Sequence, residues 1–381
     1  SVVMALFSLF VIYVTLFATW LDLLRYPSFL GCILVIGYLI YPAKTEMQQV
    51  NHMPWYDWVL LLMGAAAFFY IALNAQDITM RVVGYKSLHT YELVLGLMGI
   101  VSLVELCRRS VGLPILCVAG AFVAYALYYY LGVKDYAFME GVGQLVYRLS
   151  YTTTGILSTP IQVCAKFIVV FIIFGAFLER TGISGFFIDL ANCVAGSSSG
   201  GPAKVAVISS ALCGMVSGSS VGNTVTTGSV TIPMMKKTGY APEFAGAVEA
   251  AASTGGQIMP PIMGAAAFLM AEYVDMPYSK IIVCAILPAV LYFSGIFLSV
   301  HLEAKKLGLK GIPREELPRF TYLIRRIYLL LPLIILVALV STGARTMAWA
   351  AAISIVASVV VSLPGLLMDS REQTEEGPAM H

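Results

Sequence analysis

The chain has 381 residues, of which 59% are hydrophobic and only 12% are charged. Soluble domains contain roughly 45 to 50% apolar residues, so the composition excludes an ordinary soluble protein and indicates a polytopic membrane protein. The net charge is only +2, and the sequence has no basic stripe with interleaved aromatic residues, which excludes a nucleic-acid partner.

The first part of the chain contains a series of apolar runs with few polar interruptions. A helix of roughly 20 residues crosses the hydrocarbon core of a bilayer. The candidate spans cover residues 2–20, 28–41, 55–73, 90–106 and 111–131. Residues 1–131 are therefore predicted to form a rigid scaffold of membrane helices, without a site of their own.

A polar segment, residues 132–159, leads from this scaffold to a second block and is predicted to lie outside the cytoplasm. The second block contains the first of two glycine-rich interruptions, GMVSGSSVGNTVTTG at 214–228. Apolar arms at 201–216 and 225–235 flank it, and each arm is too short to span a membrane alone. Residues 201–235 are therefore predicted to form a re-entrant helical hairpin.

The second interruption, STGGQIMPPIMG at 253–264, breaks an otherwise helical segment at 240–273. Pro260 and Pro261 remove two amide donors, so helical pairing fails there. We expect a discontinuous transmembrane helix. Irregular backbone at membrane depth is tolerated only where protein or a wet cavity satisfies its polar groups, so both interruptions indicate a binding site.

Further apolar runs at 160–178, 278–300, 325–341 and 347–367 complete the predicted spans. We group residues 160–300 as a transport repeat, 301–324 as a basic cytoplasmic linker and 325–381 as the start of a second repeat. The predicted fold is all-α: a polytopic membrane protein with a re-entrant helical hairpin and a discontinuous transmembrane helix.

Lysine and arginine, which concentrate in cytoplasmic loops, give this layout an orientation. Each span moves the chain to the other side of the membrane. If the basic linker is cytoplasmic, this alternation places about two thirds of the 23 lysines and arginines on the cytoplasmic side. Lys166 is left within a span. The alternation requires the hairpin to enter and leave on the cytoplasmic side, where Lys204, Lys236 and Lys237 surround its base.

The two interruptions are rich in oxygen ligands. The first offers side-chain oxygens together with Gly218 and Gly222, which let the backbone turn and expose its carbonyls. A hard cation such as sodium prefers such a shell, and two helix ends at one depth favour a cation and an anion. The predicted sodium and substrate site comprises Ser217, Gly218, Ser219, Ser220, Asn223, Thr224, Thr254, Gly255, Gly256, Gln257 and Pro260. Close helix packing at the GxxxG spacings and kinks without a ligand are the alternatives.

Three ionisable residues lie in or near predicted spans: Glu249, Glu272 and Lys166. Lys166, near a span end, is predicted to extend its charge to the interface. Glu249 is either a proton or ion partner or a packing residue with satisfied hydrogen bonds. The seven cysteines show no CxxC pair and no metal-ligand spacing, so we predict that they are small apolar fillers.

An enzymatic function has one literal motif in its favour, because residues 218–222 match the G-x-S-x-G nucleophile pattern. That motif needs a strand-to-helix turn and a base. No strand precedes it; His52, His89 and His301 fall in predicted loops and His381 is terminal. The sequence also lacks a G-x-x-x-x-G-K-[ST] phosphate loop, so we predict no enzymatic activity and an ion gradient as the energy source.

The whole run from residue 200 to 273 resembles the large membrane subunit of the tripartite ATP-independent periplasmic (TRAP) transporters. FGAFLERTG at 174–182, ILPAVLYF at 286–293, LEAKKLGLKG at 302–311 and EELP at 315–318 fit the same family. The chain is most similar to the variant with fused small and large membrane subunits, which works with TAXI-type solute-binding proteins. The resemblance covers about residues 145–330, and before that only the arrangement of spans agrees, with residues 1–131 in the place of the small subunit.

The resemblance implies an elevator-type, sodium-coupled importer of small organic acids in the cytoplasmic (inner) membrane of a bacterium or archaeon. It implies a periplasmic TAXI-type binding protein as partner and no cofactor besides the coupling sodium ion. It also implies one sodium site beside the substrate, formed by the hairpin tip and the break. The family has a second, inverted hairpin and broken helix after the linker, so we expect a fragment that lacks half of the transport site.

Two functions from other classes are the alternatives. The chain could be a non-transporting membrane scaffold or docking module that presents a surface to a partner protein. A channel is the second alternative, although no ring of acidic residues and no repeated filter motif is visible in the sequence.

Overall fold

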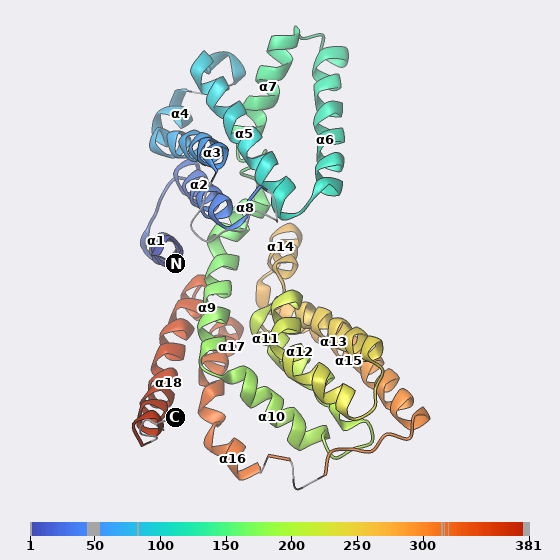
Figure 1. Cartoon of the computed structure of the whole chain (residues 1–381). Coiled ribbons are helices and arrows are strands. Elements are labelled where there is room, and N and C mark those ends of the chain that lie inside the picture. The colour runs from blue at the N-terminus through green and yellow to red at the C-terminus, as the bar shows by residue number, and fades with distance from the viewer. Residues whose placement is uncertain are drawn as a thin grey trace. The chain divides into compact units, whose positions relative to one another are not determined.

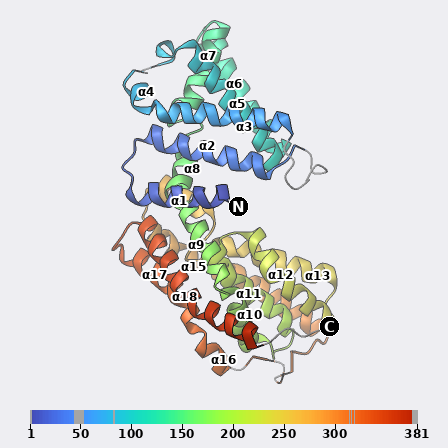
Figure 2. The same ribbon diagram turned by 60° about the vertical axis from the view of Figure 1, so that its left-hand side comes forward.

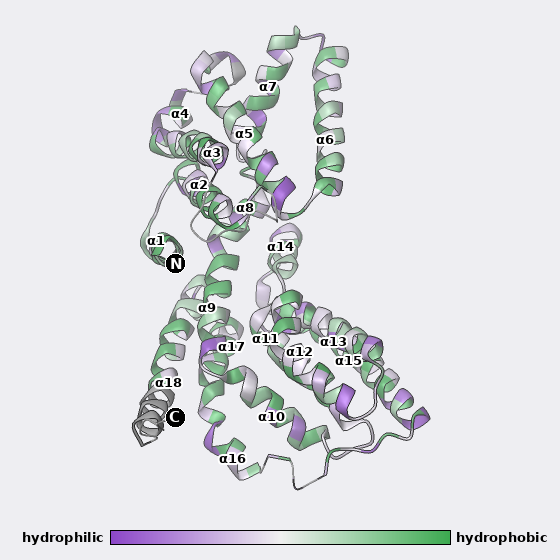
Figure 3. Ribbon diagram, viewed as in Figure 1, coloured by the Kyte–Doolittle hydropathy of each residue, from purple (hydrophilic) through white to green (hydrophobic). Residues whose placement is uncertain are grey.

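The computed structural model describes residues 2–43, 54–81, 84–313, 315, 317–318 and 320–375. Every regular element in these residues is a helix. Among the described residues, six helices are long and apolar enough to cross a membrane: Asp22–Ile40, Trp55–Leu73, Thr90–Ser110, Leu113–Val133, Thr159–Arg180 and Tyr278–Lys306. Figure 3 shows hydrophobic residues along most of their length. The predicted all-α, multi-pass membrane fold is confirmed.

The chain divides into two compact units, Ser1–Lys166 and Phe167–His381. The first unit (Figure 1) consists of α1 Val2–Phe17, α2 Asp22–Ile40, α3 Trp55–Leu73, α4 Ala75–Arg81, η2 Tyr85–Ser87, α5 Thr90–Ser110, α6 Leu113–Tyr128, η3 Tyr129–Val133, α7 Phe138–Ser150 and α8 Thr159–Val163. Helix α3 packs between α2 and α5. The unit boundary falls in the π-helical turn η4 Cys164–Ile168, inside the predicted span 160–178.

Two groups of ion pairs stabilise the first unit. The Arg109 guanidinium, 2% exposed, binds the Asp57 carboxylate at 2.7 Å and the Glu105 carboxylate at 2.8 Å, and lies over the Tyr38 ring. At the other end of α5, buried Glu92 pairs with Arg81 and accepts the His89 amide of its own N-cap at 2.7 Å. Both ends of α5 are thereby tied to neighbouring helices.

Helix α7 is an element that sequence analysis does not identify, because it lies within the polar connection 132–159. It is amphipathic: its small residues pack against α5, where the Ser150 hydroxyl donates to the Gly96 carbonyl at 3.3 Å. A helix of 13 residues is also shorter than a membrane span. The short length of α7 and its polar residues explain why the sequence does not predict this helix.

The second unit contains α9 Val169–Arg180, α10 Ile183–Ala195, α11 Gly201–Ser217, α12 Ser220–Lys237, α13 Pro242–Gly255, η5 Gly256–Ile258, α14 Ala265–Val274, α15 Tyr278–Lys306, α16 Phe320–Arg325, η7 Ile327–Leu330, α17 Leu331–Thr342 and α18 Met347–Glu375. Helices α11, α12 and α13 pack against one another, and α15 lies along α11 and α13 (Figure 2). Helix α18 packs on α9 and α17. This unit holds both glycine-rich interruptions.

Several smaller expectations can be compared with the described residues. His301, expected in a loop, lies in α15 because that helix continues to Lys306. The Lys166 ammonium lies 5.7 Å from the centre of the Tyr26 ring. All seven cysteines are described and free; Cys213 is buried, but Cys117 and Cys284 are exposed, so these two do not fill the core. His52, His381 and Glu316 of the EELP motif lie outside the described residues, as do three of the 23 lysines and arginines, Lys44, Arg314 and Arg319.

The start of α11 and the end of α12 lie close together, at the base of the hairpin. A Cβ atom on Gly200, just before α11, would come within 2.6 Å of the Tyr240 hydroxyl, just after α12, and within 2.4 Å of the Ala304 Cβ of α15. The basic residues Lys236, Lys237, Lys305 and Lys306 are at the C-terminal ends of α12 and α15. This geometry agrees with a hairpin whose base shares one membrane side with the basic linker, and that membrane placement stays a prediction.

Candidate ion and substrate site

The hairpin tip consists of only two non-helical residues, Gly218 and Ser219. Gly218 ends α11 in the left-handed conformation, with φ of 59°, which glycine adopts without steric cost. The Ser219 hydroxyl accepts the Gly222 amide at 3.2 Å and so caps α12. Helix α12 therefore starts at Ser220, five residues earlier than expected, and Gly222 is helical, which corrects the expectation that it turns the backbone.

The predicted helix at 240–273 is broken into α13 and α14, which are separated by η5 and the irregular residues 259–264; its membrane placement stays a prediction. The Tyr278 hydroxyl at the start of α15 contacts the carbonyls of Ile262 at 2.5 Å and Pro261 at 3.0 Å. The Tyr278 ring also stacks on Phe268 of α14, with the ring centres 4.4 Å apart. The break is thus an ordered turn that is held by a buried tyrosine.

The structure brings the hairpin tip and the break into direct contact. A Cβ atom on Gly214 would come within 2.3 Å of the Gly256 Cα, and a Cβ on Gly218 within 2.3 Å of the Met263 carbonyl oxygen. The Gln257 amide nitrogen donates to the Ser220 hydroxyl at 3.1 Å. Only glycine permits such close backbone approach, so Gly214 and Gly218 of the hairpin allow it to pack directly against the break.

Asn223 is the buried polar group at this contact. Its side chain is 1% exposed, and its amide nitrogen donates to the Ser210 carbonyl at 2.8 Å. That amide nitrogen would lie 3.2 Å from a Cβ on Gly256. The Oδ1 oxygen is buried and accepts no hydrogen bond from the described residues. A buried acceptor left unpaired costs about 1 to 3 kcal/mol, and a cation at this position would remove that cost.

The remaining predicted site residues are Ser217, Thr224, Thr254, Gly255 and Pro260. Ser217 remains at the tip, where its hydroxyl lies 3.5 Å from the Ser219 amide. Two hydroxyls bond within their own helices: Thr224 to the Ser220 carbonyl at 2.9 Å and Thr254 to the Ala250 carbonyl at 2.7 Å. Gly255 instead packs on α15, since a Cβ there would lie 2.5 Å from the Tyr292 ring, and Pro260 belongs to the irregular turn.

A second polar cluster surrounds Glu249 of α13, which is fully buried. Four hydroxyls contact its carboxyl group: Ser210 of α11, Thr227 and Thr231 of α12, and Ser253 of α13. The sequence indicates Glu249 as an ionisable residue near a predicted span but does not indicate these partners. The spacing of four between Thr227 and Thr231 and between Glu249 and Ser253 places each pair on one helix face, which is the signal that was available.

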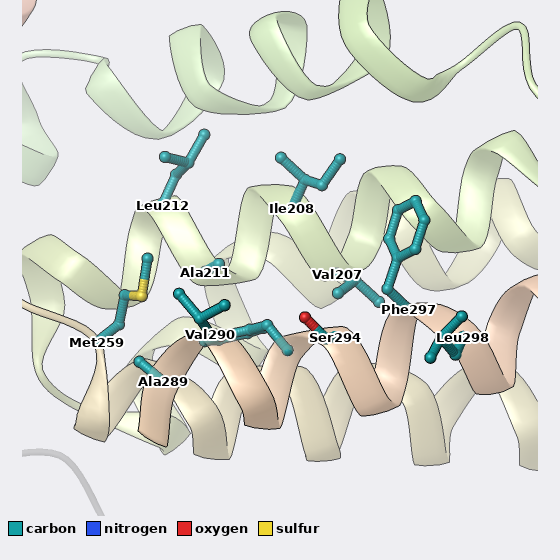
Figure 4. A pocket seen from close by; sticks show the side chains of 11 residues that line it. Val207, Ile208, Ala211, Leu212, Met259, Ala289, Val290, Ser294, Phe297 and Leu298 are labelled. Carbon is teal, nitrogen blue, oxygen red and sulfur yellow. The ribbon is translucent and has the colours of Figure 1, made fainter. Parts of the chain in front are cut away.

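One groove of the second unit is apolar. It has a volume of about 600 Å³ and lies between α11 and α15, with Met259 of the break at one end (Figure 4). Ser294 is the single hydroxyl side chain among its lining residues. Its lining therefore offers a carboxylate one hydroxyl donor and no charged side chain.

The described residues contain no group of three or more His, Cys, Asp and Glu side chains that could hold a metal ion. The hydroxyl, amide and carbonyl oxygens at the tip suit a monovalent hard cation instead.

Residues 98–377 match the model of one protein family, described as the tripartite ATP-independent periplasmic transporter, DctM component. The chain belongs to this family. The matched range contains the hairpin, the break and α15. The resemblance to the large TRAP permease is thus confirmed, and membership of a permease family agrees with the prediction that the chain is not an enzyme and is a multi-pass inner-membrane protein.

Individual DctM-family proteins share moderate similarity with the chain. It is 28% identical over 194 residues to the C4-dicarboxylate TRAP transporter large permease protein DctM of Pseudomonas aeruginosa, which covers 51% of this chain and 45% of that protein. It is 28% identical over 188 residues to the isethionate TRAP transporter permease protein DctMQ of Oleidesulfovibrio alaskensis, covering 49% and 29% respectively. The chain therefore spans less than half the length of these relatives.

Proposed function

We propose that the chain is the membrane permease component of a sodium-coupled, binding-protein-dependent secondary transporter that imports small organic acids. In this proposal a periplasmic TAXI-type solute-binding protein delivers the substrate. The scaffold of residues 1–131 stays in place while the repeat at 160–300 carries the solute across in an elevator movement. Membership of the DctM family supports the permease role.

The observation that carries the sodium proposal is the unpaired Oδ1 of Asn223. It belongs to a side chain that lies beside Gly256, where the tip and the break meet. The C-terminal end of α11 and the N-terminal end of α12 also meet at the tip. Their dipoles favour a cation at the first and an anion at the second. Sodium and a carboxylate substrate can therefore bind at the same junction.

The substrate class rests on the relatives. The Pseudomonas protein is named for C4-dicarboxylates and the Oleidesulfovibrio protein for isethionate, and both names denote small organic anions. We propose a substrate of this class for the present chain. The serine hydroxyls of the tip supply donors for its carboxylate.

Sodium-dependent thermal stabilisation of the purified 381-residue chain tests this proposal. Unfolding is followed in detergent with sodium chloride or choline chloride at the same ionic strength. Binding at 100 times the dissociation constant would stabilise the native state by about 2.7 kcal/mol. We expect sodium to raise Tm in the unsubstituted chain and to have no effect on the variant Asn223→Ala.

Asn192→Ala is the matched control, because Asn192 of α10 also has a buried, unpaired Oδ1 but is not part of the junction. This variant should keep the full sodium response. A chain that shows no sodium response, or an Asn223→Ala variant that keeps it, contradicts the sodium proposal and favours the scaffold or docking alternative. That alternative predicts partner binding that is independent of sodium.

A further inference from the structure

The apolar groove between α11 and α15 suits a hydrocarbon chain. Met259 lies at one end of it, and Phe297 and Leu298 lie at the other (Figure 4). Its lining residues on α15 run from Ala289 to Leu298, which corresponds to about 13 Å of helix. A polar ligand that is buried there would lose its hydrogen bonds to water and find one hydroxyl in exchange. The lining therefore favours an apolar occupant.

Basic residues continue the same helix faces beyond the end of the groove at Phe297. On α15, His301 follows Phe297 by four residues and Lys305 follows His301 by four, and this spacing keeps one helix face. On α11, Lys204 precedes Ile208 of the groove by four residues. The Lys204 ammonium lies 5.4 Å from the centre of the Phe297 ring. One end of the groove is therefore beside basic side chains.

Lys204 is the buried member of this basic group. It is 5% exposed, and its ammonium donates one hydrogen bond among the described residues, to the Ser198 hydroxyl at 3.2 Å. An ammonium group has three hydrogens to donate. Lys305 is close enough to Lys204 for the two like charges to repel each other. Because a charge that is buried without a counter-ion is costly, an anion beside Lys204 would stabilise this arrangement.

No carboxylate neutralises this end of the groove. Within the described part of the chain, no acidic side chain forms an ion pair with Lys204, His301 or Lys305. Helix α11 has no acidic residue, and Glu303, the single acidic residue of α15, pairs with Lys306 at 3.4 Å. The His301 Nδ1 atom is buried and has no hydrogen-bond partner in the described residues. The positive charge here is therefore uncompensated.

The length of α15 places the basic group near a bilayer surface. The helix has 29 residues and is roughly 44 Å long, whereas the hydrocarbon core of a bilayer is about 30 Å thick. The last turns of α15, which carry His301 and Lys305, therefore reach the layer of lipid headgroups. The apolar lining from Ala289 to Leu298 lies at the depth of the acyl chains.

We infer that the groove and its basic end form a binding site for an anionic phospholipid, with an acyl chain between α11 and α15 and the phosphate beside Lys204, His301 and Lys305. Basic pockets between membrane helices recognise such headgroups. A zwitterionic phospholipid offers the same acyl chain but no net charge, and a free phosphate ion lacks the apolar part. None of the eleven predicted sodium and substrate residues lines the groove, so the inference depends on neither sodium nor a substrate.

Native mass spectrometry of the 381-residue chain in detergent, without sodium, tests the inference. The chain is titrated with phosphatidylglycerol and, separately, with phosphatidylcholine that has the same acyl chains. Each lysine near an anionic lipid contributes about a fivefold gain in affinity. We expect one saturable phosphatidylglycerol molecule per chain, bound at least about tenfold more tightly than phosphatidylcholine. Equal affinities for the two lipids overturn the inference.

Val290→Trp tests the acyl-chain contact, because Val290 lines the groove and is 52% exposed, so an indole ring there fills the groove without entering the core. This variant should lose the saturable lipid. Leu291→Trp is the matched control, since Leu291 is the next residue and is also exposed but does not line the groove. Retention of the lipid in Val290→Trp, or its loss in both variants, overturns the inference.

Lys305→Gln tests the headgroup contact and should weaken phosphatidylglycerol binding about fivefold. Lys306→Gln is the matched control, because Lys306 is equally exposed to solvent by class but its charge is paired with Glu303; its effect should be less than about twofold. Equal losses in the two variants contradict the assigned headgroup position. Displacement of the lipid by millimolar inorganic phosphate would indicate a free-anion site, and a dimer that Val290→Trp abolishes would mean that a second copy occupies the groove. Either result overturns the inference.

Discussion

Gly214 and Gly256 touch through their backbones: a Cβ on Gly214 would come within 2.3 Å of the Gly256 Cα, and a Cβ on Gly256 within 2.7 Å of the Gly214 Cα. Gly214 lies near the end of α11 and Gly256 begins η5. The contact joins the hairpin to the broken helix without any side chain at that point. The hairpin and the broken helix are therefore packed too closely for a side chain to fit between them at this point.

Gly214→Ala should separate the two segments. Overpacking at a tight contact typically costs about 1 to 3 kcal/mol, and we expect a loss of that size together with loss of the sodium response. Gly246→Ala on α13 is the matched control, because a Cβ there meets no atom within 4 Å. It should be neutral or stabilise the helix by about 0.5 to 1 kcal/mol. Unfolding in detergent measures both variants, and equal stabilities would contradict the contact.

Arg109→Met should strongly destabilise the first unit. The substitution leaves the Asp57 carboxylate, 1% exposed, without its cation, and breaking a buried pair costs about 3 to 5 kcal/mol. Arg108→Met is the control, because Arg108 binds the same Glu105 but is 43% exposed; it should cost less than about 1 kcal/mol. Similar losses in the two variants would show that the Asp57 pair is not important for stability.

Tyr278→Phe removes the hydroxyl that contacts the carbonyls of Pro261 and Ile262. The aromatic packing stays, so the expected loss is the cost of unpaired buried carbonyls, about 1 to 3 kcal/mol. Tyr273→Phe on α14 changes an exposed ring and should have no measurable effect. Hydrogen exchange of the amides in residues 259–264 should increase in Tyr278→Phe alone; unchanged exchange would contradict the role of this hydroxyl.

Labelling of single cysteines tests whether the hairpin is re-entrant. In a chain without its native cysteines, Ser197→Cys and Lys236→Cys report the two ends of the hairpin, and both positions are exposed. A membrane-impermeant thiol reagent should reach both from the cytoplasmic side. Lys280→Cys, exposed near the start of α15, should react from the opposite side. Labelling of positions 197 and 236 from different sides would mean that the α11–α12 pair crosses the membrane.

The sequence was sufficient to locate both interruptions, because glycine and proline within apolar runs mark where helices stop. It did not locate the start of α12, since that depends on whether the Ser219 hydroxyl finds the Gly222 amide. Helices α7 and α10 were missed because both have 13 residues, too few for a span.

The contacts of the site could not be predicted from local pattern. Gln257 meets Ser220, 37 positions away, and Gly255 turns toward α15, whereas Gly256 beside it faces α11. Such choices depend on how whole helices pack. The assignment of all eleven predicted residues to a sodium and substrate site stays a prediction.

A hairpin with only two non-helical residues at its tip has little conformational freedom there. A loop of ten residues can swing aside like a lid, but Gly218 and Ser219 are fixed between two helix ends by the turn itself and by the Gly222 cap. Access to anything bound beneath the tip therefore requires whole helices to slide past one another, and the rate of entry and exit should be set by the packing of α11 and α12 against η5.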